Sequence, residues 1–360
     1  MGYNYNFVFP LSPTPIPIRM KTLFLTSLSL FWLQASATVH TVNNNVPSPG
    51  QYTSVSAAIT AAANGDTIYI SASPYNYNGF TVNKELTFIG SGHKPQNVNT
   101  NVSFVDNITI SANNVRIVGF NLNRVEGSST QNNLIVERCL VRDRVSLSGN
   151  WTNVTLESNV FESTATNFNP NYYAAFNGVT VKNNIFNGTI QDAWGYYGMN
   201  NFLIKNNLFL NATQAFSGSN RLLTINNNIF YRANPANTVT SSSFNNNISF
   251  QCANNAFPIG ASSNTGSGNI ENTDPLLVNF PAAGAYFSYT YDYNLQSTSP
   301  AKNAGTDGKD IGLTGGDGYF QKFGIPPIPQ IRNLTITSPA GGVVNPGGTL
   351  QINVISTIRR

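Results

Sequence analysis

The chain of 360 residues has only 9% charged residues and a formal net charge of +4, with 54 Asn, 29 Gly and 19 Pro. Its 41% hydrophobic and 12% aromatic residues can bury a core, which excludes a disordered chain. Asn, Gly, Ser and Thr are poor helix formers, so their abundance excludes a helical bundle, and the weak, scattered charge excludes a nucleic-acid-binding surface.

Residues 1–37 have the pattern of an upstream extension followed by a signal peptide. Met20-Lys21 opens a short positive region, Thr22–Leu33 is mostly apolar, and Ala35-Ser36-Ala37 has the small-x-small pattern of a cleavage site. The apolar run is shorter than the roughly 20 residues that a membrane anchor needs. We therefore predict export, with Met20 as the start, Thr38 as the first mature residue and no membrane span after processing.

The mature chain opens with a predicted cap. Between Thr53 and Ala63, apolar residues recur at helical spacing behind a Thr/Ser cap, and the turn Asn64-Gly65-Asp66 leads into a strand at Thr67–Ile70. A short amphipathic helix here would cover the N-terminal edge of a sheet, which would otherwise invite aggregation.

A repeat then runs through the middle of the chain: aliphatic, x, aliphatic, two polar residues, Asn, and an apolar pair. It reads VTLESNVF at 154–161, VTVKNNIF at 179–186, FLIKNNLF at 202–209 and LTINNNIF at 223–230, with weaker copies at 115–122, 134–141 and 242–249. The period-two alternation within each copy indicates strands, and the spacing indicates a solenoid. We predict an all-β fold, a right-handed parallel β-helix with three short strands per coil.

The sixth position of the repeat is the predicted bend. It is occupied by Phe120, Cys139, Asn159, Asn184, Asn207, Asn228 and Asn247, at steps of 19, 20, 25, 23, 21 and 19 residues. Asn tolerates the left-handed backbone of a sharp bend, and stacked Asn side chains can form an internal hydrogen-bonded ladder. The longer steps predict variable connections at Thr164–Asn171 and Gly188–Ala193, on one face of the solenoid.

The C-terminal residues predict a different structure. A Pro-rich connector at Gly324–Pro329 precedes two alternating segments, Asn333–Thr337 and Thr349–Ile355, which predict a hairpin. The domain organisation that follows is 1–37 extension and signal peptide, 38–316 parallel β-helix with its N-terminal cap, and 317–360 connector and hairpin.

From about Gln51 to Gly316 the chain resembles the pectin-lyase-like superfamily of right-handed parallel β-helix proteins. The opening QYTSVSAAITAAANGDTIYI is similar to the entry helix and first strand of these folds, and the Asn repeat is similar to their ladder. The closing TDPLLVNF … YDYNLQSTSPAKNAGTDGKDIG resembles the exit of many secreted bacterial β-helix proteins. The resemblance implies the fold; members with activity are mostly polysaccharide lyases and glycoside hydrolases, and others are adhesin-like surface proteins.

No catalytic motif is found in the sequence. Inverting hydrolysis needs two carboxyl groups facing each other across the sugar, and the acids rarely align in the repeat. Asn272-Thr273-Asp274 matches only the first part of the hydrolase pattern of the family. His40 and His93 form no metal or triad constellation.

A binding site is predicted where long connections, arginines and aromatic residues coincide, from about Arg142 to Gln214. Arginine can hold a sugar carboxylate through two hydrogen bonds, and aromatic rings stack on sugar faces. The predicted site residues are Arg142, Asp143, Arg144, Tyr172, Asp192, Trp194, Tyr197 and Gln214. The alternatives are that the charged residues form exposed ion pairs, and that about half of the aromatic residues face the core.

Two further expectations concern cysteines and cofactors. Cys139 and Cys252 lie five coils apart, about 24 Å, so a disulfide is excluded and both should be free, buried thiols. No cofactor is expected; the alternative is Ca²⁺ held by Asp143 with Asp192.

The function hypothesis is a secreted or cell-surface protein that binds an extracellular polysaccharide or cell-surface glycan. Whether it also cleaves that polysaccharide, as a lyase or glycoside hydrolase, stays open. The alternative is a non-catalytic surface or matrix protein, adhesin-like, in which the solenoid is a rigid spacer. We expect a monomer and no nucleic-acid partner.

Overall fold

The computed structural model describes residues 37–94, 101–170, 175–191, 199–235, 238–318, 320–338 and 351–357. The predicted signal segment therefore lies outside the described residues. No helix in the described part of the chain has the length and apolarity to span a bilayer.

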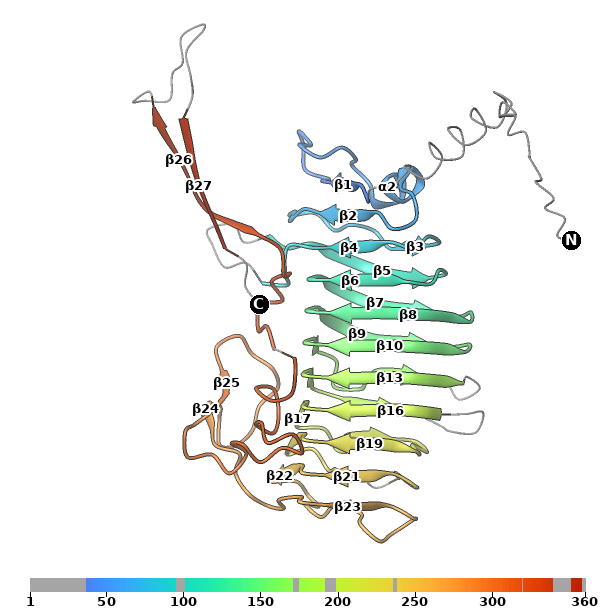
Figure 1. Cartoon of the computed structure of the whole chain (residues 1–360), viewed down its shortest axis with the longest axis vertical. Helices are drawn as coiled ribbons and strands as arrows, with labels where there is room; N and C mark the ends of the chain where they lie inside the picture. The colour runs from blue at the N-terminus through green and yellow to red at the C-terminus, as the bar shows by residue number, and fades with distance from the viewer. Residues whose placement is uncertain are drawn as a thin grey trace, which may run out of the picture. The chain divides into compact units, whose positions relative to one another are not determined.

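The main body is a parallel β-solenoid, as predicted (Figure 1). One side is an 11-stranded parallel sheet, in which each coil contributes one strand. In pairing order its strands are β1 (Val39–Val42), β2 (Thr67–Ile70), β4 (Thr87–Ile89), β6 (Val115–Val118), β8 (Gln131–Glu137), β10 (Trp151–Glu157), β13 (Phe176–Lys182), β16 (Met199–Lys205), β19 (Leu223–Asn226), β21 (Ser243–Asn245) and β23 (Thr265–Ser267).

The other side is a 12-stranded sheet that forks at one strand. It begins with β3 (Phe80–Val82), β5 (Phe104–Ile110), β7 (Asn121–Gly127) and β9 (Leu140–Leu147). The start of β9 pairs with β11 (Val160–Phe161), and its end pairs with β12 (Thr166–Pro170). The predicted three strands per coil therefore describe the later coils, whereas in β5, β7 and β9 the second and third strands are continuous.

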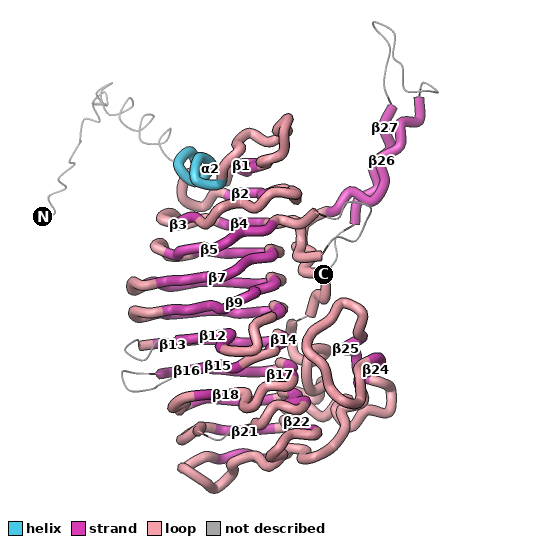
Figure 2. Tube along the Cα trace, turned by 180° about the vertical axis from the view of Figure 1, so that it is seen from behind, coloured by secondary structure: helices cyan, strands magenta, loops and turns pink. Residues whose placement is uncertain are grey.

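Beyond the fork the sheet has two faces. The short-strand face continues from β11 through β14 (Ile185–Phe186), β17 (Leu208–Leu210), β20 (Ile229–Tyr231) and β22 (Ile248–Phe250). The third face continues from β12 through β15 (Thr189–Gln191) and β18 (Phe216–Ser217). Figure 2 shows the third face, with β7, β9, β12, β15 and β18 stacked along the solenoid.

The predicted variable connections are partly correct in position. Thr164–Asn171 contains β12 and Gly188–Ala193 contains β15, so most of these residues complete a coil. Compared with the coil that precedes both, the first of these coils has three additional residues between Phe161 and Phe168 and two between Phe168 and Phe176. The second has three additional residues between Ile190 and Met199. Sequence spacing gives the length of a coil, and it does not tell which of the turns holds the additional residues.

The N-terminal cap is confirmed. The helix α2 (Val55–Ala61) begins at Ser54, whose side chain accepts a hydrogen bond from the N–H of Ala57 at 3.2 Å. Val55, Ala58 and Ile59 are buried, so the helix packs its apolar side on the first coils.

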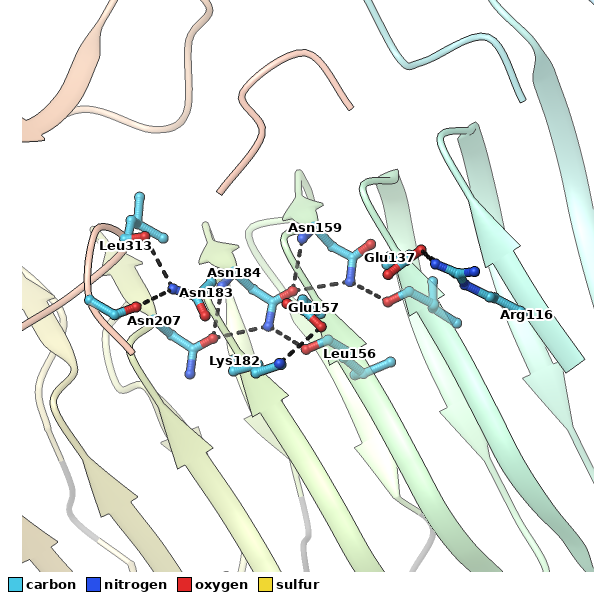
Figure 3. Close-up of polar contacts among 12 residues, drawn as sticks. Arg116, Glu137, Leu156, Glu157, Asn159, Lys182, Asn183, Asn184, Asn207 and Leu313 are labelled. Atoms are coloured by element: carbon cyan, nitrogen blue, oxygen red, sulfur yellow. Dashed lines mark hydrogen bonds and ion pairs between the residues drawn. The ribbon is translucent and has the colours of Figure 1, made fainter. Parts of the chain in front are cut away.

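The interior ladder is confirmed and is one coil longer than predicted (Figure 3). The Nδ2 of Asn159 donates to Oδ1 of Asn184 at 3.0 Å, and the same contact repeats at 2.9–3.0 Å down to Asn269. Asn159, Asn184 and Asn207 are fully buried. A parallel column of phenylalanines, Phe161, Phe186, Phe209 and Phe230, stacks with ring centroids 4.6–5.0 Å apart.

The predicted cause of the bend is corrected by one position. The left-handed residue of each bend precedes the ladder Asn: Ser158, Asn183, Asn206, Asn227 and Asn246 have φ of +51° to +58°. The ladder residues themselves are absent from the left-handed region. The two residues of each Asn–Asn doublet thus have different roles. The first has the left-handed backbone of the bend, and the second makes the buried hydrogen bonds.

The exit segment folds back over the short-strand face. We call residues 271–328 the return strap; it contains the antiparallel pair β24 (Leu277–Asn279) and β25 (Asp292–Leu295). An apolar layer joins the strap to the solenoid, formed by Ile185, Leu208, Leu210, Ile229, Tyr231 and Ile248 below and by Leu277, Tyr293, Leu295, Ala301, Ile311 and Leu313 above. The strap therefore buries the outer side of that face.

The first Asn of each doublet also holds the strap. The Nδ2 of Asn183 donates to the carbonyl oxygens of Leu313 and Gly315 at 3.1 and 3.0 Å (Figure 3). The Nδ2 of Asn206 donates to the carbonyl oxygens of Asp310 and Gly312, both at 3.2 Å. The doublets therefore make two columns of hydrogen bonds, one inside the solenoid and one to the strap.

The expected C-terminal hairpin and the two free cysteines are confirmed. The C-terminal hairpin forms from β26 (Gln330–Ser338) and β27 (Gln351–Thr357), which pair antiparallel. Cys139 and Cys252 are free and buried, and burial raises the pKa of their thiols to about 12 and about 11.

Candidate functional site

The predicted charge cluster lies on β7 and β9, and its groups bind one another. Arg124 donates from Nε to Oδ2 of Asp143 at 2.8 Å and from Nη1 to Oε1 of Glu126 at 2.7 Å. Arg144 lies with Nε 3.3 Å from the other oxygen of Asp143, without a hydrogen bond from that nitrogen. The alternative of partly exposed ion pairs describes these contacts, each worth under about 1 kcal/mol.

Arg142 is placed differently from its neighbours. Its Nε donates to Oδ1 of Asn121 at 2.8 Å, and its guanidinium carbon lies 4.8 Å from the ring centroid of Phe104. The side chain is thus held along the coil by a hydrogen bond and a cation–π contact.

The other predicted site residues fall into two groups. Tyr172, Asp192, Trp194 and Tyr197 lie outside the described residues, in the segments that follow β12 and β15. Gln214 lies between β17 and β18, half-buried, with a buried Oε1 that has no hydrogen-bond partner. Arg142 lies within β9 and Gln214 lies just before β18, whereas the aromatic residues follow β12 and β15 in the sequence.

The third face carries a row of polar side chains that the motif search missed. Strand pairing aligns Glu126 with Ser146 and Ser146 with Asn169. In the two coils that follow, Gln191 pairs with Ser217. All five are half-buried, one from each coil. The period-two alternation of apolar and polar residues in these strands is the sequence signal that could have predicted this row.

A pocket of about 510 Å³ opens between the return strap and three successive coils. Its lining residues are Asn211, Ala212, Thr213, Arg232, Asn234, Ala253, Gly284, Ala285 and Tyr286. Asn211 and Arg232 directly follow β17 and β20, and both have a left-handed backbone, with φ of +50° and +55°. The same turn in neighbouring coils therefore presents these side chains side by side to the strap.

The strap wall of the pocket depends on one glycine. Gly284 has φ of +76°, and a Cβ at this position would lie 2.1 Å from Cδ of Arg232 and 2.8 Å from Oδ1 of Asn211. The left-handed backbone favours glycine at this position, and a larger residue would have to displace the side chains of Arg232 and Asn211.

The pocket presents a cation, amides and an aromatic ring. Arg232 is exposed, donates from Nη1 to Oε1 of Gln251 at 3.3 Å, and has no ion pair with any carboxylate among the described residues. Tyr286 is 47% exposed. Asn234 donates from Nδ2 to the carbonyl oxygen of Thr213 at 2.7 Å, which ties two coils together at the pocket floor.

The pocket lining includes no acid and no histidine. The acids with lowered pKa serve structural positions: a hydrogen bond from Lys309 lowers the pKa of Asp317, and hydrogen bonds from Thr38 and Ala63 lower that of Asp66. In the described ranges, no three His, Cys, Asp or Glu side chains gather as a metal site requires. The pocket can therefore bind a polar ligand, and its lining has no carboxyl or imidazole group.

The chain has a low-scoring likeness to solved structures. No family model matches the sequence, and no curated protein matches it. Among solved structures, the chain is similar to the crystal structure of pectate lyase Pel9A, with a TM-score of 0.39 and 14% identity, over 78% of this chain and 97% of that chain. The chain has the right-handed parallel β-helix fold that its resemblance to the pectin-lyase-like superfamily implied; this likeness concerns the fold alone.

Proposed function

We propose that the protein is an exported carbohydrate-binding β-helix protein that holds a glycan in the pocket between the return strap and the solenoid. The observation that carries the proposal is that Tyr286 and Arg232, both exposed, line one concave site of ligand size.

Each group has a chemical role toward a sugar. The ring of Tyr286 offers a flat apolar surface for the C–H face of a pyranose. Asn211 and Thr213 offer donors and acceptors to hydroxyl groups. Arg232, which has no carboxylate partner among the residues that the structure describes, can hold a carboxylate or sulfate substituent through two N–H groups.

A second surface is available for a longer glycan. The polar row of the third face, with Asn169 and Gln191 at its centre, repeats once per coil, about 4.8 Å apart. Of the predicted site residues that the structure describes, Arg142, Asp143 and Arg144 lie on β9, a strand of this face. This surface is the alternative location, and an adhesin-like rod without glycan binding is the alternative function.

The test is a glycan array probed with the exported protein, followed by calorimetric titration of the strongest ligand. Tyr286→Ala should weaken binding by about 1–3 kcal/mol, a loss of roughly 5- to 150-fold, with nucleobase stacking as the analogue. Tyr75→Ala is the matched control, because Tyr75 is 61% exposed in the N-terminal cap and does not line the pocket. The Tyr75→Ala variant should bind the glycan with the affinity of the wild type.

The alternatives give different results in the same titration. If Asn169→Ala with Gln191→Ala abolishes binding and Tyr286→Ala does not, the glycan binds the third face. If no glycan binds, the rod hypothesis replaces the proposal. Reducing-end and unsaturated-sugar assays on the bound glycan test separately whether the protein also cleaves it.

A further inference from the structure

The first coil is closed by one buried carboxylate. Asp66, 5% exposed, lies in the turn after α2. Its Oδ1 accepts a hydrogen bond from the backbone N–H of Thr38 at 2.8 Å, and its Oδ2 accepts one from the N–H of Ala63 at 2.8 Å. Oδ2 also lies 2.9 Å from Nε2 of His40, so Asp66 joins the start of the chain to the cap.

The residue held by Asp66 is the one that follows the predicted cleavage site. The sequence Ala35-Ser36-Ala37 ends directly before Thr38. The compact unit of the chain begins at Thr38, whose carbonyl oxygen accepts the first hydrogen bond from β2, the N–H of Thr67 at 2.9 Å. Ala37, Thr38 and Val39 are exposed, so a peptidase can reach the bond between Ala37 and Thr38.

We propose that hydrolysis of the Ala37–Thr38 bond converts the N–H held by Asp66 into an α-ammonium group, which forms an ion pair that locks the N-terminal cap. One water is consumed: its oxygen goes to the new carboxylate of Ala37, and the amine of Thr38 takes up a proton. The hydrogen bond to Oδ1 is kept, a full positive charge is added to it, and the other ammonium protons face solvent.

The neighbouring charged residues Lys84 and Glu85 have hydrogen-bond partners other than Asp66. Lys84 donates to the carbonyl oxygens of Ile59, Thr60 and Ala62 at the end of α2, at 2.6–2.9 Å. Glu85 accepts from Asn114 at 2.9 Å. The side chain of His40 also contacts Asp66, and cleavage does not change this contact.

The proposal makes the cap dependent on processing. Strand β1 is the edge of the 11-stranded sheet, and it is paired only with β2 among the described strands of that sheet. An ion pair at its first residue holds that edge closed after export. Before cleavage the same position has a neutral amide, and the edge lacks this contribution.

The experiment begins with the N-terminus of the exported protein. Its intact mass should correspond to a chain that starts at Thr38. The α-amine is then labelled by reductive methylation with ¹³C-formaldehyde, and its titration is followed by NMR. A free α-amino group titrates at about 7.7–8.0, and the ion pair should raise this pKa by about one unit.

Asp66→Asn is the matched variant, because it keeps the hydrogen-bond acceptor and removes the charge. Its α-amine should titrate near the free value. A chain that starts at another residue, or a wild-type amine that titrates at or below about 8, overturns the proposal. The wild-type titration alone decides the question if the variant does not fold.

Discussion

The replacement of Asn207 by Leu is the sharpest perturbation of the interior ladder. Oδ1 of Asn207 accepts hydrogen bonds from the N–H of Asn184 at 2.9 Å and from Nδ2 of Asn184 at 3.0 Å. Its own Nδ2 donates to the carbonyl oxygen of Val181 at 2.9 Å and to Oδ1 of Asn228 at 3.0 Å. Leucine has about the same size and can make none of these contacts.

The magnitude follows from the groups left unpaired. In Asn207→Leu the N–H of Asn184 loses its acceptor in a fully buried position. The Nδ2 of Asn184 keeps the carbonyl oxygen of Leu156, and Oδ1 of Asn228 keeps the backbone N–H of residue 207. One orphaned buried N–H costs about 1–3 kcal/mol, which is the expected loss in the free energy of unfolding.

Urea denaturation followed by circular dichroism measures this loss. With a slope of about 2–3 kcal/mol per molar urea, the midpoint should fall by about 0.3–1.5 M. Asn177→Leu is the control, because Asn177 is exposed on β13 and its change should stay within about 0.5 kcal/mol. Equal midpoints for the two variants would refute the energetic role of the ladder.

Three more predictions follow from the buried groups. Burial lowers the pKa of His93 to about 3, so folding stability should fall as pH drops below about 6.5, by up to about 1.4 kcal/mol per pH unit; an unfolding midpoint that responds to pH equally in His93→Gln would contradict this. Asn206→Ala removes two hydrogen bonds to the strap, and hydrogen exchange in residues 306–316 should become faster; unchanged exchange would show that the apolar layer alone holds the strap. The thiols of Cys139 and Cys252 should react with a disulfide reagent only on unfolding, because both are buried; rapid reaction of the native protein would contradict their placement.

The fold could be predicted because its signal repeats. The apolar alternation and the Asn at the sixth position occur in coil after coil, and each coil must stack on the next to bury its interior side. The prediction was wrong where the repeat does not distinguish between two neighbouring residues. It placed the left-handed residue on Asn184 instead of Asn183, since both residues of the doublet are Asn and either tolerates that backbone.

The strap and its pocket could not be predicted in the same way. Asn183 and Asn206 contact carbonyl oxygens of the strap, which every residue carries, so no sequence pattern marks these contacts. Tyr286 and Arg232 line one pocket because the strap returns over the solenoid, and the strap has no sequence repeat that would predict this return. The cluster of charged residues near Arg144 could be recognised in the sequence. Only the structure shows that Asp143 lies against both Arg124 and Arg144 and so neutralises part of their charge.

Hydrogen–deuterium exchange with and without the glycan selected on the array tests the central claim most directly. The account predicts slower exchange in residues 211–214, 232–234 and 284–286, which line or adjoin the pocket, and unchanged exchange in the third-face strands β12 and β15. Protection confined to β12 and β15, with none at the strap, would contradict it.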